Sequence, residues 1–107
     1  MTDASAQEPE GEAPDFPGYL VRHMEIVNRK GLHARATAKL VQCIDRFDCD
    51  VLISKGGETV GGASIMGILT LGAGIGSTIT IVAKGSEAKP ALDALAALIA
   101  DKFGEGE

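Results

Sequence analysis

The chain has 107 residues, of which 45% are hydrophobic and 4% aromatic, and its formal net charge is -5. This length suits one domain with a small core and leaves little apolar area for a deep internal pocket. The charge is uneven, because residues 1–18 hold five acidic residues and no basic one, whereas residues 19–104 hold all 10 basic residues. The weak positive charge of that segment excludes a nucleic-acid-binding surface and favours an acidic protein partner.

The composition predicts one domain over residues 19–104 between two tails. Residues 1–18 are acidic and rich in proline and glycine, which predicts a disordered tail, and residues 105–107 form a short C-terminal tail. The N-terminus lacks the basic start and apolar run of a secretory signal, and no apolar run reaches the length of a membrane span. We therefore expect a cytoplasmic protein without membrane insertion.

The first half of the domain is predicted to be strand, helix and hairpin. Residues 19–27 alternate between apolar and polar side chains, which predicts a half-buried strand. Apolar residues recur at helical spacing from Ala34 to Phe47. Two short strands, 50–54 and 58–63, are joined by a lysine and two glycines, and such glycines supply the positive φ of a tight turn.

The second half is predicted to be a short helix, a strand and a long helix. Ser64 is a natural N-cap for the short apolar helix that follows it. The β-branched stretch 77–85 predicts a strand, and the last helix is expected to start after Ser86 as its cap and to stop at Gly104. This order predicts an α+β domain in which a four-stranded antiparallel sheet carries three helices on one face.

One of the two histidines, His33, lies where the first predicted helix begins. The free N–H groups of a helix start attract anions, and phosphate in particular. A neutral imidazole is nucleophilic, so His33 could accept a phosphoryl group, and Arg35 could bind the same oxygens. These features alone also fit a polar residue at the boundary of a helix, and they leave both interpretations open.

Other chemistries find little support in the sequence. Cys43 and Cys49 are six residues apart, which fits neither a redox pair nor a zinc ligand set, so we interpret them as ordinary thiols. There is no Walker loop, no Ser/His/Asp order and no metal-ligand spacing. We therefore expect neither a metal nor a cofactor.

Two motifs resemble the HPr family of histidine-containing phosphocarriers in the bacterial phosphoenolpyruvate-dependent phosphotransferase system. GLHAR (31–35) is similar to the family's active-site motif and SIMGILTLG (64–72) to its second signature, and the likeness extends over residues 19–103. It implies an open-faced β-sandwich. It also implies that His33 takes a phosphoryl group on Nδ1 from phosphorylated enzyme I, the phosphoenolpyruvate-protein phosphotransferase, with help from Arg35. His33 would pass the group to a histidine of an enzyme IIA domain, so the chain would be a carrier and not an enzyme.

Transient docking of such partners calls for a small apolar patch ringed by basic residues. The resemblance places it on the two motif helices, with these candidate residues: Ala34, Arg35, Ala38, Lys39, Ile65, Met66, Ile68 and Leu69. Ser64 matches the serine that an HPr kinase/phosphorylase modifies in many bacteria, although a role as helix cap alone explains it equally well.

The sequence departs from the family at Ala36, where proline is usual. Alanine retains a backbone N–H and fixes φ less firmly, so we expect the site to persist with a more mobile helix start. One alternative is an interaction module of the same fold that binds proteins without transferring phosphate, against which His33 and Arg35 argue. A second is an unrelated α/β small-molecule sensor, which would need a ligand pocket.

Overall fold

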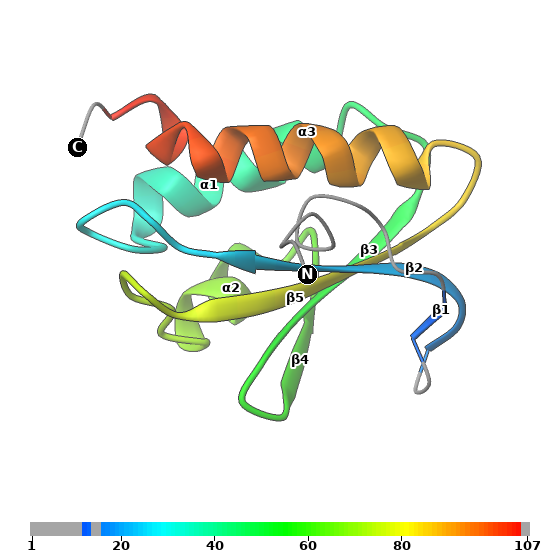
Figure 1. Cartoon of the computed structure of the whole chain (residues 1–107), viewed down its shortest axis with the longest axis horizontal. Helices are drawn as coiled ribbons and strands as arrows, with labels where there is room; N and C mark the ends of the chain where they lie inside the picture. The colour runs from blue at the N-terminus through cyan, green and yellow to red at the C-terminus, as the bar shows by residue number, and fades with distance from the viewer. Residues whose placement is uncertain (1–11, 14–15, 106–107) are drawn as a thin grey trace, which may run out of the picture.

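The computed structural model describes residues 12–13 and 16–105, and Figure 1 shows two long helices packed over an antiparallel sheet. The strands of the sheet lie in the order β1-β2-β5-β3-β4. They are β1 (Glu12–Ala13), β2 (Phe16–Glu25), β3 (Asp50–Lys55), β4 (Glu58–Gly61) and β5 (Thr78–Lys84). The helices are α1 (Ala34–Ile44), α2 (Ile65–Thr70) and α3 (Ala88–Ala100), and a 3-10 helix, Lys102–Gly104, follows α3. The predicted fold is confirmed, with the two-residue β1 added at one edge.

The hydrophobic core lies between the sheet and the helices. Strand β5 is central, pairing with β2 on one side and β3 on the other, and its Ile79 and Ile81 are fully buried. Leu40 of α1, Ile68 of α2 and Leu92 of α3 belong to the same core cluster. Each side chain of this kind contributes about 1.5–3 kcal/mol when it is fully buried. All three helices are therefore held against the sheet by one core.

Several element boundaries differ from the sequence prediction. Strand β2 begins at Phe16, so residues 16–18 belong to the sheet and not to the predicted tail. Residues 1–11 and 14–15, where that tail was also predicted, lie outside the described residues. Helix α1 ends at Ile44, three residues before the predicted end.

The predicted cap of the last helix is wrong. Glu87 is the N-cap residue of α3, and the hydroxyl of Ser86 instead donates to Asp48 Oδ2 at 3.1 Å. The helix also ends before the predicted stop, at Ala100, and the backbone of Lys102, Phe103 and Gly104 then has positive φ. Ser86 thus fastens the β5–α3 connection to the loop before β3, a long-range contact that local sequence signals do not reveal.

One buried charge departs from the expected pattern of β2. Arg22 is 1% exposed under α3, where its guanidinium donates to Leu92 O at 3.1 Å and to Asp93 Oδ1 at 2.6 Å. Since buried charges need partners, Asp93 and the carbonyl make this position tenable for arginine. The hydrogen bond from Arg22, with help from Lys89, lowers the pKa of Asp93. This ion pair joins β2 to α3.

Candidate functional site

The loop 28–33 carries His33 to the start of α1. Gly31 has φ +66, and a Cβ there would lie 2.5 Å from Ala73 O, so only glycine fits between the two loops. Leu32 N donates to Ala73 O at 2.9 Å, which joins the loop to residues 72–76, and His33 N donates to Gly31 O at 2.9 Å. The glycine of the GLHAR motif therefore sets the position of the histidine that follows it.

His33 occupies the N-cap position of α1. Its backbone is extended, with φ -77 and ψ 179, and its side chain makes no cap hydrogen bond. The carbonyl of His33 accepts from Thr37 N at 2.9 Å, which closes the first turn. Ala36 is fully buried, and α1 begins at Ala34 although the usual proline is missing. The first N–H groups of α1 thus lie next to a partly exposed imidazole, an arrangement that suits a phosphoryl group.

A carboxylate from the chain end contacts the imidazole. His33 Nε2 is hydrogen-bonded to Glu105 Oε2, and Asn28 Nδ2 donates to Glu105 Oε1 at 3.3 Å. Burial raises the pKa of Glu105, but the hydrogen bonds from His33 and Asn28 and the charge of Lys39 outweigh it and hold the pKa below its usual value. Glu105 is therefore ionised at neutral pH. Residue 105 was predicted to be part of a tail, but the structure places it in the site.

Asn28 and Glu105 are site residues that were not predicted from the sequence. Asn28 is fully buried and also donates to Gly31 O at 2.9 Å, so it orders the loop as well as the carboxylate. An asparagine three residues before a glycine is a turn signal that could have singled out Asn28, whereas no local signal marks Glu105.

The remaining predicted residues of α1 lie around His33. Ala34 and Arg35 are exposed, and Ala38 and Lys39 are half-buried. Among residues 12–13 and 16–105, Arg35 forms no ion pair, so its guanidinium is available to a ligand at the helix start. Lys39 is engaged, because its Nζ donates to Phe103 O at 2.6 Å.

Helix α2 divides its apolar residues between surface and core. Met66 and Ile65 are 71% and 40% exposed, as a docking patch requires, and Leu69 is half-buried. Ile68 is fully buried, so its prediction as a docking residue is wrong: in this six-residue helix its side chain faces the core. Ile75, which the sequence analysis did not select, is 61% exposed in the loop that contacts Gly31.

Ser64 is the N-cap of α2, as predicted. Gly67 N donates to Ser64 Oγ at 3.1 Å, and Ser64 itself is exposed beside Ile65 and Met66. A Cβ at residue 67 would lie 2.8 Å from that oxygen, which explains the glycine. The cap and an accessible hydroxyl thus coexist at one residue.

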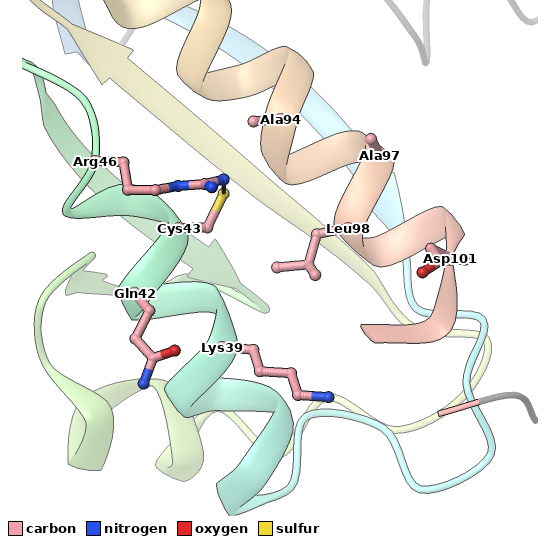
Figure 2. A pocket seen from close by; sticks show the side chains of 8 residues that line it. All are labelled: Lys39, Gln42, Cys43, Arg46, Ala94, Ala97, Leu98 and Asp101. Atoms are coloured by element: carbon pink, nitrogen blue, oxygen red, sulfur yellow. Dashed lines mark hydrogen bonds between the residues drawn. The ribbon is translucent and has the colours of Figure 1, made fainter. Parts of the chain in front are cut away.

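An open groove runs between α1 and α3 (Figure 2). Its lining is mainly the stems of long side chains and small apolar residues, contributed by Lys39, Gln42, Cys43, Arg46, Ala94, Ala97, Leu98 and Asp101.

Both cysteines are free, and burial together with nearby carboxylates raises the pKa of the Cys49 thiol. Within the described part of the chain, no cluster of His, Cys, Asp and Glu side chains could hold a metal ion, and no helix is long and apolar enough to cross a bilayer.

Comparison with known proteins assigns the family. The family model described as "PTS HPr component phosphorylation site" matches residues 20–101. This chain belongs to the PTS-HPr family. It is 51% identical over 88 residues to phosphocarrier protein HPr of Cupriavidus necator, covering 82% of this chain and 99% of that protein. It is 44% identical over 86 residues to phosphocarrier protein NPr of Shewanella violacea, covering 80% and 94%.

The solved structures agree with this assignment. The crystal structure of HPr-C-His from Thermoanaerobacter tengcongensis superimposes with a TM-score of 0.76 at 39% identity, covering 79% of this chain and 96% of that one. The chain is thus a phosphocarrier of the HPr/NPr type, a relay component of the phosphotransferase system whose general partners are enzymes I and IIA. The alternative of an unrelated small-molecule sensor is overturned by this family membership.

Proposed function

We propose that His33 accepts a phosphoryl group on Nδ1 from phosphorylated enzyme I and passes it to a histidine of an enzyme IIA domain in the cytoplasm. The observation that carries the proposal is the orientation of the ring. Nε2 is hydrogen-bonded to Glu105, whereas Nδ1 makes no hydrogen bond within residues 12–13 and 16–105. The nitrogen left for chemistry is therefore Nδ1.

Charge at the helix start supports the same assignment. A phosphoryl group on His33 would lie beside the first N–H groups of α1, which stabilise an anion by roughly 0.3–2 kcal/mol. Arg35 is two residues away and exposed, and a guanidinium can form two charge-assisted hydrogen bonds with phosphate oxygens. Both interactions are reversible, as a carrier requires.

The docking surface we propose consists of Ile65, Met66, Leu69, Ala34 and Ala38, with Arg35 at its rim. Helices α1 and α2 contact each other, which supports one docking surface made from both. Lys39 takes a smaller part than the sequence suggested, because its ammonium is bonded to Phe103 O. A small apolar area with basic neighbours favours fast encounter and fast release.

The decisive experiment is intact mass spectrometry after incubation with phosphoenolpyruvate and enzyme I. We expect one phosphate on the wild-type chain, lost after brief acid treatment, and none on His33→Ala. The matched control is His23→Ala, because His23 is exposed on β2, where its Nδ1 is bonded to Thr80 Oγ1 at 2.9 Å. Absence of phosphate on the wild type, with enzyme I active on another carrier, would favour the interaction module that only binds proteins.

A second, regulatory role at Ser64 is favoured by its exposure. A phosphate there would add roughly -1.5 to -2 charge beside Ile65 and Met66 and repel an acidic partner, while the helix start tolerates the charge. We propose an HPr kinase/phosphorylase as the modifying enzyme. Incubation with such a kinase and ATP should phosphorylate the wild type and not Ser64→Ala; an unmodified wild type would leave Ser64 as a cap alone.

A further inference from the structure

We propose that Glu105 is a positioning residue for His33: it accepts a hydrogen bond from Nε2–H, fixes the ring tautomer, and so leaves Nδ1 as the nucleophile. This inference rests on the proposed function, since it concerns how the same histidine accepts phosphate. The contact joins residues 72 positions apart in the sequence.

The hydrogen bonds around the carboxylate determine which nitrogen carries the proton. An ionised carboxylate can only accept hydrogen bonds, and a neutral imidazole has one N–H. The nitrogen that faces Glu105 Oε2, Nε2, must therefore be the protonated one. The other oxygen, Oε1, accepts from Asn28 Nδ2 at 3.3 Å, so both oxygens of Glu105 are held in place.

The backbone conformation of the chain end brings this carboxylate to the histidine. After α3, Lys102 and Phe103 both have φ +56 and Gly104 has φ +74, so three successive residues are in the left-handed region. Non-glycine residues adopt that region at a cost of roughly 1–2 kcal/mol each. Burial of the Phe103 side chain, which is 1% exposed, and the bond from Lys39 Nζ to Phe103 O offset this cost.

This turn reverses the chain. Gly104 N donates to Asp101 O and Glu105 N donates to Lys102 O, both at 3.0 Å. Glu105 consequently arrives at the loop 28–33, and its side chain is only 9% exposed. The strained backbone of residues 102–104 is held in place by the buried Phe103 and leads to a carboxylate that contacts His33. Strain at such a place points to a functional reason for it.

The chemistry of transfer explains what the contact contributes. The lone pair of His33 Nδ1 forms a bond to phosphorus while the bond from phosphorus to enzyme I breaks and its electron pair leaves with enzyme I. The ring then carries phosphate on Nδ1 and hydrogen on Nε2, so it is positively charged. The Glu105 carboxylate, already hydrogen-bonded to Nε2–H, stabilises that charge. When the phosphoryl group moves on to enzyme IIA, the electron pair of the breaking bond returns to Nδ1 and the neutral tautomer is restored.

The test compares Glu105→Ala and Glu105→Gln with the wild type, and uses Glu58→Gln as control. Glu58 is an exposed residue of β4, so this control removes one negative charge elsewhere on the chain. The first readout is the ¹⁵N spectrum of the His33 ring at a pH where imidazole is uncharged. The second is the rate of phosphorylation by phosphorylated enzyme I. The spectrum needs no partner protein, so it tests the contact even if the proposed function fails.

We expect the wild type and Glu58→Gln to show the Nε2–H tautomer alone and Glu105→Ala to show both tautomers. Glu105→Ala should be phosphorylated about tenfold more slowly, the effect of losing a hydrogen bond to a charged group. Glu105→Gln keeps an acceptor without the charge, so it should retain the tautomer and lose part of the rate. Wild-type tautomer and rate in both Glu105 variants, with the folded state intact, would overturn the proposal.

Discussion

The substitution Gly31→Ala tests how the GLHAR loop is held against the loop before β5. Gly31 has φ +66, and an added Cβ would lie 2.5 Å from Ala73 O and 2.7 Å from Gly74 Cα. Both atoms are backbone, so no side chain can rotate away, and the loop 72–76 must move. We expect a loss of both folding stability and phosphate acceptance, since His33 N is bonded to Gly31 O.

The magnitude follows from four contributions, of which three are destabilising and one is stabilising. The left-handed conformation costs an alanine roughly 1–2 kcal/mol, and the smaller entropy of the unfolded alanine chain returns about 0.4–1 kcal/mol when the site is free of strain. Displacing the loop breaks the bond from Leu32 N to Ala73 O, worth about 1 kcal/mol, and exposes apolar surface around Leu32, which is 6% exposed. The free energy of unfolding should fall by roughly 2–4 kcal/mol, a large part of the 5–15 kcal/mol typical of a domain.

Urea unfolding followed by circular dichroism measures this loss, and Gly56→Ala is its control. Gly56 has φ +59 in the β3–β4 turn but no atom within 4 Å of its added Cβ. It therefore suffers the backbone penalty without the steric one, and should lose roughly 1 kcal/mol or less. Equal losses for the two variants would refute the close approach of the two loops.

Three further predictions concern the surface, the buried ion pair and the chain end. Met66→Glu should slow phosphotransfer about tenfold by repelling acidic partners, while its thermal unfolding stays unchanged. A change at the buried residue of the same helix, Ile68→Ala, should instead lower stability by roughly 2–5 kcal/mol. A destabilised Met66→Glu would contradict the exposure of Met66. Asp93→Asn should destabilise the domain at neutral pH by up to about 1 kcal/mol, because Asp93 is half exposed. The pKa of Asp93 is lowered in the folded state, so the stabilisation by Asp93 is present above its unfolded pKa and is lost as pH falls through its folded pKa. The stabilities of the wild type and Asp93→Asn should therefore converge in acid. A constant difference in stability down to low pH would refute the pairing with Arg22. Phe103→Ala should lower stability by roughly 3–5 kcal/mol and give the same mixed His33 tautomers as Glu105→Ala; an unchanged ring spectrum would show that Phe103 does not hold the chain end.

Much of the fold was predictable because its signals are local. The hairpin glycines, the Ser64 cap and the β-branched stretch of β5 each depend on neighbours a few residues away, and all are found as predicted. The start of α1 at Ala34 and the place of His33 before it were also predicted. Errors arose at ends, such as Ser86, where a residue distant in sequence supplies the partner.

The assignment of side chains to core or surface was only partly predictable. The short helix α2 is nearly all apolar, so its composition could not separate exposed Met66 from buried Ile68. In β2, alternation predicted a half-buried strand, yet nothing nearby indicated that Arg22 is buried. Its burial depends on Asp93 and Leu92 O, which α3 supplies from about 70 residues later.

The sequence alone thus determined the three α-helices, the four longer strands, their order and the histidine at a helix start, because hydrophobic period, turn chemistry and capping act over a few residues. The tertiary structure decided which nitrogen of His33 is hydrogen-bonded to Glu105 and which apolar residues of α2 are exposed. It also decided that Glu105 belongs to the site, since its contacts with His33 and Asn28 depend on the buried Phe103 and on the turn at the chain end. Contacts between residues far apart in sequence depend on how the whole core packs, and no short window of sequence encodes that packing.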